Sequence, residues 1–482
     1  MRACIVCLVV AVGVAHADPS ADAWRALTRN DIEAAYALVN DNHPATLPEA
    51  HDTAFVATLR AAHDTAIEHA AAVSSFEGYR AVLAEFALSL GDGHLWSRPL
   101  IEPREVRWAG ILAGRRGTTW VVAANEPALT GEDLTGARIL TCDNQPIDSV
   151  ARDALAYRAQ PGVEASVILR AGWLLIDDGN PFIHRPRECQ FQHKGRDIRL
   201  VLHWTAIDLS QLRTKYWKLP VGRAGFDAHP ADRGGYWVAI EELNAQAQHV
   251  IDSVKAAVST VRAARYVVVD LRGNGGGNDL YGRLLANLIY GDAHVAAVLG
   301  PMPDDAATCK SAWRASPGNL AHLEGLLAER KQLHEAAAIG HLSTAVDELK
   351  AALAAGRHLT APLTCPTAHK SAPAPSLIRA PVFVLTDSAC FSSCIGTLDM
   401  FRKLGAIQIG HASSADTHNS EVREIKLPSG LSMFSTLQAI MPDAPYRIGP
   451  FAPAHVFAGD ITDIAVIQRW LADSVLPAHG IR

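Results

Sequence analysis

The stretch Arg265-Tyr-Val-Val-Val-Asp-Leu-Arg-Gly-Asn-Gly-Gly-Gly277 decides the fold of this chain. Residues 266–271 form a short run of apolar and β-branched side chains, which is typical of a strand buried on both faces. The run ends in a glycine cluster, and a helical pattern follows over residues 281–290. Such a turn leaves backbone N–H groups free at the carboxyl end of a sheet, where they can hold a phosphate or an oxyanion.

The glycine cluster fits neither of the two common phosphate-binding motifs. No Gly-Lys-Ser/Thr follows it, as a P-loop requires, and its spacing differs from the dinucleotide fingerprint. An oxyanion hole is therefore the sharper hypothesis, and it needs a nucleophile from elsewhere in the chain. The plain alternative is a turn at a sheet edge, in which glycine supplies a positive φ.

The segments around this stretch alternate between strand and helix patterns. Residues 235–240 predict a strand and residues 245–261 an amphipathic helix, so that a right-handed β-α-β unit leads into strand 266–271. The sheet resumes at residues 382–386 and 406–410. The pattern predicts an α/β core with parallel strands.

A second turn from strand to helix carries the candidate nucleophile. Strand 382–386 runs into Asp387-Ser-Ala-Cys-Phe-Ser-Ser-Cys394, and a helix is expected over residues 395–404. The amino end of a helix favours an alkoxide or oxyanion because of its free N–H groups and its dipole. The plain alternative is an N-capping serine with inert neighbours.

Two further regions precede the α/β core. Residues 18–102 predict a helical N-terminal domain that ends in a glycine-flanked Asp92-Gly93-His94 loop, although a loop histidine is usually solvated and inert. Residues 103–206 are β-rich, and Gly136-Ala-Arg-Ile-Leu-Thr-Cys-Asp-Asn-Gln-Pro-Ile-Asp148 resembles the strand-turn-strand of a PDZ domain. Such modules bind an extended peptide at a sheet edge; the alternative is a β-rich spacer without a ligand. Strands are expected at 118–123, 138–142, 166–169 and 198–203.

Taken together, these motifs resemble the C-terminal-processing/tricorn-core family of serine peptidases. The Gly-rich strand-turn is the specific one, and the Asp-Gly-His loop, the PDZ-like run, Leu427-Pro-Ser-Gly430 and Gly449-Pro-Phe-Ala-Pro453 occur in the order of the family. The resemblance implies a multi-domain α/β protein with a ClpP/crotonase-like peptidase core over residues 207–482. A helical insertion over residues 301–375 interrupts this core and lies outside the resemblance.

The resemblance also assigns roles to residues. It implies Ser392 as the nucleophile, with Ser393 as the near competitor. The backbone N–H of Gly275 or Gly276, together with that of Ser393, would form the oxyanion hole. In the tricorn-core branch a histidine of the helical domain is the general base, and it corresponds to His94.

The group that orients His94 is left open between several acids. The C-terminal-processing branch activates its serine with a lysine, but Asp416 stands at that position here. The tricorn-core branch places a glutamate near the closing Gly-x-x-Pro, and residues 447–453 contain none. Asp416, Glu421 and Asp92 remain as candidates for the charge partner.

The resulting hypothesis is a serine peptidase that acts on peptides or unfolded proteins without a metal or other cofactor. The alternative is a catalytically inactive peptide- or ligand-binding protein on the same scaffold, since a fold does not guarantee an activity. A cysteine nucleophile, from the flanking Cys390 and Cys394, and an esterase or crotonase-like acyl-transfer enzyme are weaker alternatives. The second lacks a Gly-x-Ser-x-Gly elbow.

Composition and the N-terminus bear on compartment and partners. The chain has 482 residues, of which 49% are hydrophobic, and its net charge of −6 disfavours nucleic acid as a partner. Residues 1–17 read as a signal peptide cleaved near Ala17, so that an exported, periplasmic or secreted protein without membrane insertion is expected. The remaining six cysteines favour disulfides, with Cys309 and Cys365 as the preferred pair. They are Cys142, Cys189, Cys309, Cys365, Cys390 and Cys394.

Overall fold

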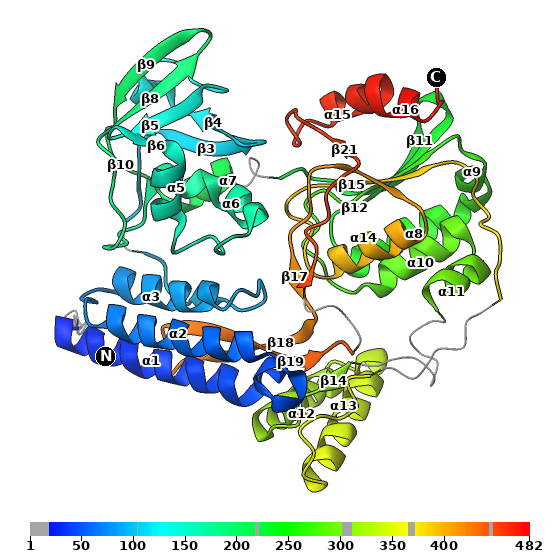
Figure 1. Cartoon of the computed structure of the whole chain (residues 1–482), viewed down its shortest axis with the longest axis horizontal. Coiled ribbons are helices and arrows are strands. Elements are labelled where there is room, and N and C mark those ends of the chain that lie inside the picture. The colour runs from blue at the N-terminus through cyan, green and yellow to red at the C-terminus, as the bar shows by residue number, and fades with distance from the viewer. Residues whose placement is uncertain (1–18, 104, 217–220, 301–310, 365–371, 443–446) are drawn as a thin grey trace, which may run out of the picture.

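The protein is a mixed α/β chain of several packed units, seen in a computed structural model (Figure 1). The structure describes residues 19–103, 105–216, 221–300, 311–364, 372–442 and 447–482. The expected signal peptide and the expected Cys309–Cys365 pair lie outside these residues. Two other pairs, Cys142–Cys189 and Cys390–Cys394, are disulfide-bonded. Within the described ranges, no helix combines the length and the apolar character needed to cross a bilayer.

The α/β core is built on a six-stranded sheet in the order β11-β12-β13-β15-β16-β21. The pairs from β12 to β21 are parallel, as expected from the β-α-β pattern, and β11 adds an antiparallel edge strand beside β12. β13 and β15 lie side by side, with Asp270 opposite Leu385, so their carboxyl ends meet. The strands are β11 (Phe226–Ala231), β12 (Gly235–Ile240), β13 (Val267–Asp270), β15 (Val382–Thr386), β16 (Ile407–Gly410) and β21 (His455–Val456).

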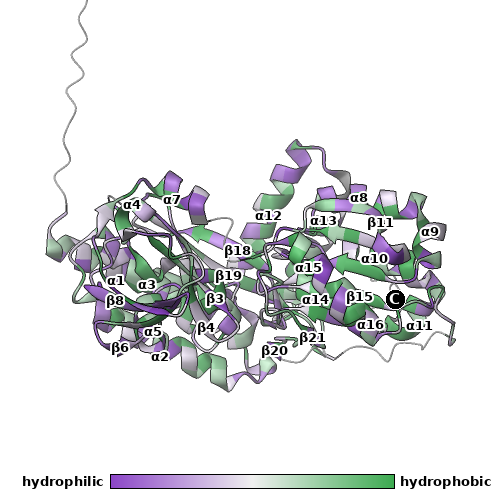
Figure 2. Ribbon diagram, turned by 90° about the horizontal axis from the view of Figure 1, so that it is seen from above, coloured by the Kyte–Doolittle hydropathy of each residue, from purple (hydrophilic) through white to green (hydrophobic). Residues whose placement is uncertain are grey.

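Helices cover both faces of this sheet (Figure 1). α8 (Ala245–Ala256), α10 (Leu280–Tyr290) and α14 (Ser393–Lys403) pack on one face, and α15 (Ile464–Trp470) packs on the other. α10 is coloured mainly as hydrophobic in Figure 2, in keeping with its buried Leu285 and Ile289. The single helix expected over 245–261 is wrong in one respect. The backbone leaves helical geometry at Ala257 (φ −101°, ψ 15°), and α9 (Val258–Ala263) follows.

The helical N-terminal region consists of α1 (Ala21–Asn42), α2 (Thr53–Ala70) and α3 (Phe76–Ser89). Each helix begins after a side chain that accepts a hydrogen bond from its first turn. These capping residues are Ser20, Asp52 and Ser75. The three helices share a core with β18 (Asn419–Lys426) and β19 (Ser432–Ile440), where the ring centroids of Phe86 and Phe434 are 5.5 Å apart. A hairpin from the C-terminal part of the chain therefore completes the N-terminal unit.

The β-rich region has a sheet in the order β3-β4-β5-β8-β9. The disulfide Cys142–Cys189 joins facing residues of β5 and β8. The strand expected at 166–169 is wrong, because this segment is the helix α6 (Glu164–Arg170). α6 packs on the core of this region with Ala165 buried, so tertiary packing overrides the local strand pattern. The strands are β3 (Ile111–Arg116), β4 (Thr119–Asn125), β5 (Arg138–Cys142), β8 (Glu188–His193) and β9 (Arg196–Val201).

The described part of the insertion contains β14 (Ala312–Trp313), α12 (Pro317–Gln332) and α13 (Ala336–Ala354). β14 pairs with β19, and the two helices pack on each other through Leu323 and Leu349. Ser316 Oγ donates to Asn42 Oδ1 at 2.8 Å, at the end of α1. The insertion is thus fastened to the N-terminal unit.

Candidate active site

Ser392 lies in the turn between β15 and α14, which we call the nucleophile turn (residues 387–394). Its backbone adopts φ +54° and ψ −130°, a conformation that non-glycine residues rarely take. The disulfide Cys390–Cys394 brackets this residue, and both sulfur-bearing side chains are fully buried. The strained conformation is held by its surroundings, as is common where a side chain must be presented for chemistry.

The loop Asp92-Gly93-His94 brings a histidine to this turn from the end of α3. The Asp92 carboxylate accepts the His94 backbone N–H at 2.8 Å, and Ser435 of β19 donates its hydroxyl to the His94 carbonyl at 2.8 Å. A Cβ atom at Gly93 would lie 2.6 Å from the Phe391 ring, so glycine permits the close approach of loop and turn. The rings of His94 and Phe391 have centroids 4.5 Å apart.

The imidazole of His94 lies between a serine and two carboxylates. His94 Nε2 is 3.0 Å from Ser392 Oγ, within hydrogen-bond distance. On the other side of the ring, Nδ1 is 3.2 Å from Asp416 Oδ1 and 3.3 Å from Asp92 Oδ1. Asp416 belongs to β17 (Asp416–Thr417), which pairs with β20 (Arg447–Ile448). Residues 447–453, which contain no glutamate of their own, therefore support through β20 the strand that carries Asp416.

Electrostatics follow from this arrangement. Burial lowers the pKa of His94, but the Asp416 and Asp92 carboxylates outweigh burial and raise the pKa to about 10. Burial in turn raises the pKa of Asp92, and the hydrogen bonds and charge from His94, with the Thr417 hydroxyl, lower it overall below its usual range. The imidazolium form is thus strongly stabilised in this pocket. One nitrogen and two carboxylate oxygens of Asp92, His94 and Asp416 lie within 4.8 Å of one another, a donor set that could also ligate a cation.

The Gly-rich loop (residues 273–277) packs directly against the nucleophile turn. Asn274 accepts the Phe391 N–H through its carbonyl at 3.3 Å, and a Cβ atom at Gly276 would lie 2.8 Å from the Ser392 Cβ. The Gly276 N–H donates to Asn274 Oδ1 at 2.9 Å. By contrast, the N–H groups of Gly275 and Ser393 have no acceptor among the described residues.

Of the other candidate residues, Ser393 is hydrogen-bonded to the Gly-rich loop, and Glu421 is not in contact with the residues around Ser392 in the described structure. Ser393 Oγ donates to the Gly277 carbonyl at 2.7 Å. Glu421 takes φ +64° in β18, and its carbonyl accepts Gln438 Nε2 at 3.4 Å. In the described part of the chain, the structure gives Glu421 no contact with His94 or Ser392. Ser392, His94 and Asp416 come together with Asp92.

A cavity of about 600 Å³ lies between the β-rich region and the core, and its lining reaches the neighbours of the site but does not include Ser392, His94 or Asp416. β3 and α6 contribute Arg115 and Ile168, and the core contributes Ser388 and Ala415. Ala415 immediately precedes Asp416, and β3 is an edge strand of its sheet. A salt bridge between Arg116 and Asp460, 3.8 Å long, spans the two units beside the cavity.

Several contacts of the site have no signal in the sequence. Phe391 and Ser435 hold the His94 loop, yet an isolated Phe or Ser carries no motif. Thr417 could have been suspected only from its place next to Asp416. Asp387 follows the predicted strand 382–386 without any motif of its own, and its carboxylate is fully buried behind the Gly-rich loop.

Comparison with known proteins shows which family and which fold this chain resembles. Residues 237–444 match the model of Peptidase family S41. The chain superposes on the crystal structure of mature CPAF with a TM-score of 0.60 at 12% identity, covering 94% of this chain and 97% of that chain. The structure of mature CPAF complexed with lactacystin gives 0.59 at 13% identity, covering 91% and 95%. These likenesses show the shared fold. A search of curated protein sequences found no significant match.

Proposed function

From the premise that the α/β core of this chain belongs to peptidase family S41, and that the chain is a serine-type peptidase, we propose roles for two residues. Ser392 is the nucleophile, and His94 is the general base. The observation that carries the proposal is the 3.0 Å contact between His94 Nε2 and Ser392 Oγ. It joins a loop of the N-terminal unit to a turn of the core. The overall reaction is hydrolysis of a peptide bond through an acyl-enzyme.

In the acylation half, neutral His94 takes the proton of Ser392 Oγ at Nε2 as the oxygen attacks the peptide carbonyl. The resulting imidazolium is stabilised by Asp416 and Asp92, which lie 3.2 and 3.3 Å from Nδ1. The oxyanion takes hydrogen bonds from the N–H groups of Gly275 and Ser393, which have no acceptor in the described part of the protein. We assign Gly275 rather than Gly276 because the Gly276 N–H is turned onto Asn274.

The tetrahedral intermediate then collapses. His94 Nε2 returns its proton to the leaving amine, and the C–N bond breaks to leave an ester on Ser392. In the second half, water takes the place of the amine: His94 removes its proton, the oxygen attacks the ester, and Ser392 recovers the proton as the acid leaves. Both halves use the same two N–H donors.

The competing nucleophiles fit the geometry less well. The hydroxyl of Ser393 donates to the Gly277 carbonyl, and no described base contacts it. Cys390 is joined to Cys394 in a disulfide, so it has no thiol to ionise. A purely binding role would leave the Ser392–His94–Asp416 alignment without a use.

The substrate is proposed to be a peptide or an unfolded protein segment that reaches Ser392 along the cavity beside Asp416. The cavity has an edge strand, β3, on one side and the core on the other, so an extended chain fits its shape. Export is proposed as well. The two disulfides favour an oxidising compartment, in agreement with the signal pattern at the N-terminus.

The direct test is hydrolysis of a casein-derived peptide pool by the wild type and three variants. Ser392→Ala and His94→Ala are expected to lower kcat by roughly 10⁴-fold or more. Ser393→Ala, the matched control in the same turn, should keep kcat within about tenfold, since it loses only one hydrogen bond behind the loop. Full activity in Ser392→Ala would overturn the assignment.

A further inference from the structure

Behind the Gly-rich loop lies a buried carboxylate that the chemical steps do not use. Asp387 directly follows β15 and begins the nucleophile turn, five residues before Ser392, and its side chain is 0% exposed. Its oxygens accept backbone N–H groups from three separate segments. Gly222 donates to Oδ2 at 2.8 Å, Ala389 donates to Oδ1 at 3.0 Å, and Gly273 donates to Oδ2 at 3.1 Å and to Oδ1 at 3.2 Å.

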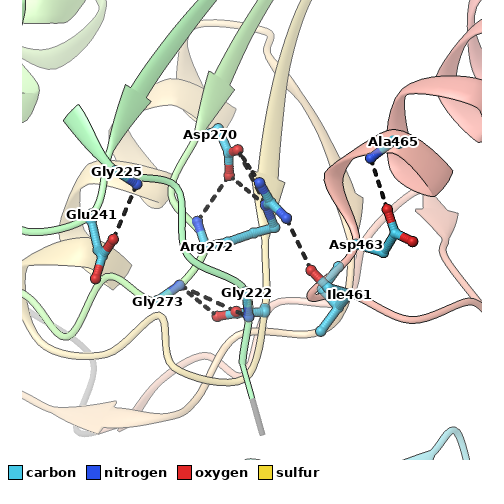
Figure 3. Close-up of polar contacts among 10 residues, drawn as sticks. Gly222, Gly225, Glu241, Asp270, Arg272, Gly273, Ile461, Asp463 and Ala465 are labelled. Atoms are coloured by element: carbon cyan, nitrogen blue, oxygen red, sulfur yellow. Dashed lines mark hydrogen bonds and ion pairs between the residues drawn. The ribbon is translucent and has the colours of Figure 1, made fainter. Parts of the chain in front are cut away.

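The backbone around this carboxylate is shaped to bring the donors close. Gly273 adopts φ +78°, and a Cβ atom there would lie 2.6 Å from the Gly222 carbonyl oxygen. A Cβ atom at Gly222 would meet the Arg272 side chain at 2.8 Å. Glycine is therefore required at both positions, since a side chain would push the donors away from Asp387. Figure 3 shows Gly222 and Gly273 side by side at the end of this polar network.

The neighbouring charges do not neutralise Asp387. Arg272 faces it but is bonded to Asp270, with Nε 2.9 Å from Oδ1 and Nη2 2.7 Å from Oδ2, and its Nη1 donates to the Ile461 carbonyl (Figure 3). Glu241, with its partner Arg223, lies at the rim of the same turn. Asp387 is thus a buried charge held mainly by amide N–H groups.

We propose that Asp387 is the positioning residue of the oxyanion hole: its ionised carboxylate ties Gly273, where the Gly-rich loop begins, to Ala389 in the nucleophile turn. This inference rests on the proposed function. Asp387 holds the loop from behind, and the Phe391 N–H holds it from the front through the Asn274 carbonyl. Together the two contacts fix the distance between the Gly275 and Ser393 N–H groups. Protonated Asp387 would present an O–H where N–H donors converge and would release the loop.

The pH at which this happens follows from the surroundings. Burial raises the pKa of Asp387 to about 6, and the hydrogen bonds from Gly273, Ala389 and Gly222, with the charge of Arg272, only partly oppose it. Above about pH 6 the carboxylate is charged and the loop is held. Below it the carboxyl is neutral and the oxyanion hole is expected to lose its geometry. This loss comes in addition to protonation of His94.

The test is the rate of acylation of the full mature chain by p-nitrophenyl acetate, a small ester that needs the oxyanion hole but no peptide pocket. As pH is lowered, the logarithm of the wild-type acylation rate should fall by one unit per pH unit down to about pH 6. Below about pH 6 it should fall by two units per pH unit. In Asp387→Asn the second bend should vanish, and acylation at pH 8 should be slower by about 10²-fold with unchanged ester affinity. His411→Gln is the control, since the pKa of His411 is lowered from the ordinary histidine value by burial while its ring contacts Phe457. That variant should keep both slopes.

The outcomes separate the two proposals. No acylation of folded wild type at any pH would overturn the proposed function itself. Suppose that acylation is lost in Ser392→Ala, and that the wild type stays folded to pH 5. If the logarithm of the wild-type rate then falls by only one unit per pH unit over the whole range, the role of Asp387 alone is overturned. The wild-type slope keeps this inference testable even if Asp387→Asn fails to fold. A folded Asp387→Asn with the wild-type rate would contradict it as well.

Discussion

His94 Nε2 lies 3.0 Å from Ser392 Oγ although 298 residues separate them in the chain. The contact exists because the β18–β19 hairpin leaves the core and packs on the N-terminal helices, where Ser435 holds the His94 carbonyl. The N-terminal unit and the core therefore form one site between them. Neither part holds the site alone.

Activity is expected to rise steeply with pH. The pKa of His94 is raised to about 10, so only roughly one-thousandth of the imidazole is neutral at pH 7. Since His94, as the proposed base, must be neutral to accept the Ser392 proton, kcat/KM should increase about tenfold per pH unit between pH 7 and 9. A rate profile against a fixed peptide checks this. A flat profile over that range would place the pKa of His94 near its ordinary value.

Stability should move in the opposite direction over the same range. The folded state raises the pKa of His94, so its contribution is fully present below about 6.5 and is lost as pH rises toward 10. Denaturant unfolding of the wild type from pH 6.5 to 10 should show a falling free energy of unfolding. His94→Gln, which cannot titrate, should show a smaller fall. Equal slopes in the two proteins would contradict the buried ion cluster.

The carboxylates of Asp416 and Asp92 both lie beside His94 Nδ1, so each should partly replace the other when one is removed. Asp416→Asn or Asp92→Asn removes one negative charge, so the acid limb of kcat/KM should shift to lower pH in either variant. Each substitution should cost less than the roughly 10⁴-fold known for a triad with one carboxylate. The double variant should approach that figure. A full 10⁴-fold loss in Asp416→Asn alone would assign the orienting role to Asp416 and leave Asp92 as a loop brace.

Glycine at position 93 should be required by the Phe391 ring. A Cβ atom there would lie 2.6 Å from Phe391 Cζ, so Gly93→Ala is expected to displace the His94 loop and lower kcat at least about tenfold. Phe391→Leu makes room, and the double variant Gly93→Ala/Phe391→Leu should recover part of the loss. Kinetics of the four proteins form the test. Additive losses in the double variant would show that the two residues act independently.

The two disulfides should differ in what they protect. Cys142–Cys189 closes a separation of 47 residues and Cys390–Cys394 one of 4, so loop entropy predicts about 4 and about 2 kcal/mol of stabilisation. Replacing the first pair by serine should lower stability with kcat largely retained. Replacing the second should lower kcat as well, since it frees the turn that carries Ser392. Unfolding curves and kcat for both double variants decide this.

The parts of the site that the sequence predicts are those coded by neighbours along the chain. The strand that leads into the glycine cluster (266–271) and the strand that leads into the serine turn (382–386) are adjacent and parallel. Their carboxyl ends therefore meet. The family resemblance supplied His94. Its loop reaches the core through the β18–β19 hairpin, and local sequence does not encode that long-range packing.

Other features could not be predicted because tertiary packing decides them. Residues 166–169 read as a strand because of Val167 and Ile168, yet the segment forms α6, which packs on the core of the β-rich region. The sequence leaves the partner of His94 open among Asp416, Glu421 and Asp92, and the pairing of β17 with β20 holds Asp416 near Nδ1. Asp387 directly follows the predicted strand 382–386, and two of its three backbone donors, Gly222 and Gly273, come from distant segments.

The most direct test of the account is intact-mass labelling of the mature protein with a fluorophosphonate. One adduct on the wild type and on Ser393→Ala, absent from Ser392→Ala and strongly slowed in His94→Ala, is the expected result. An adduct that persists in Ser392→Ala would contradict the assignment of the nucleophile. No adduct on folded wild type, at pH 9 as well as pH 7, would contradict a working Ser392–His94 pair.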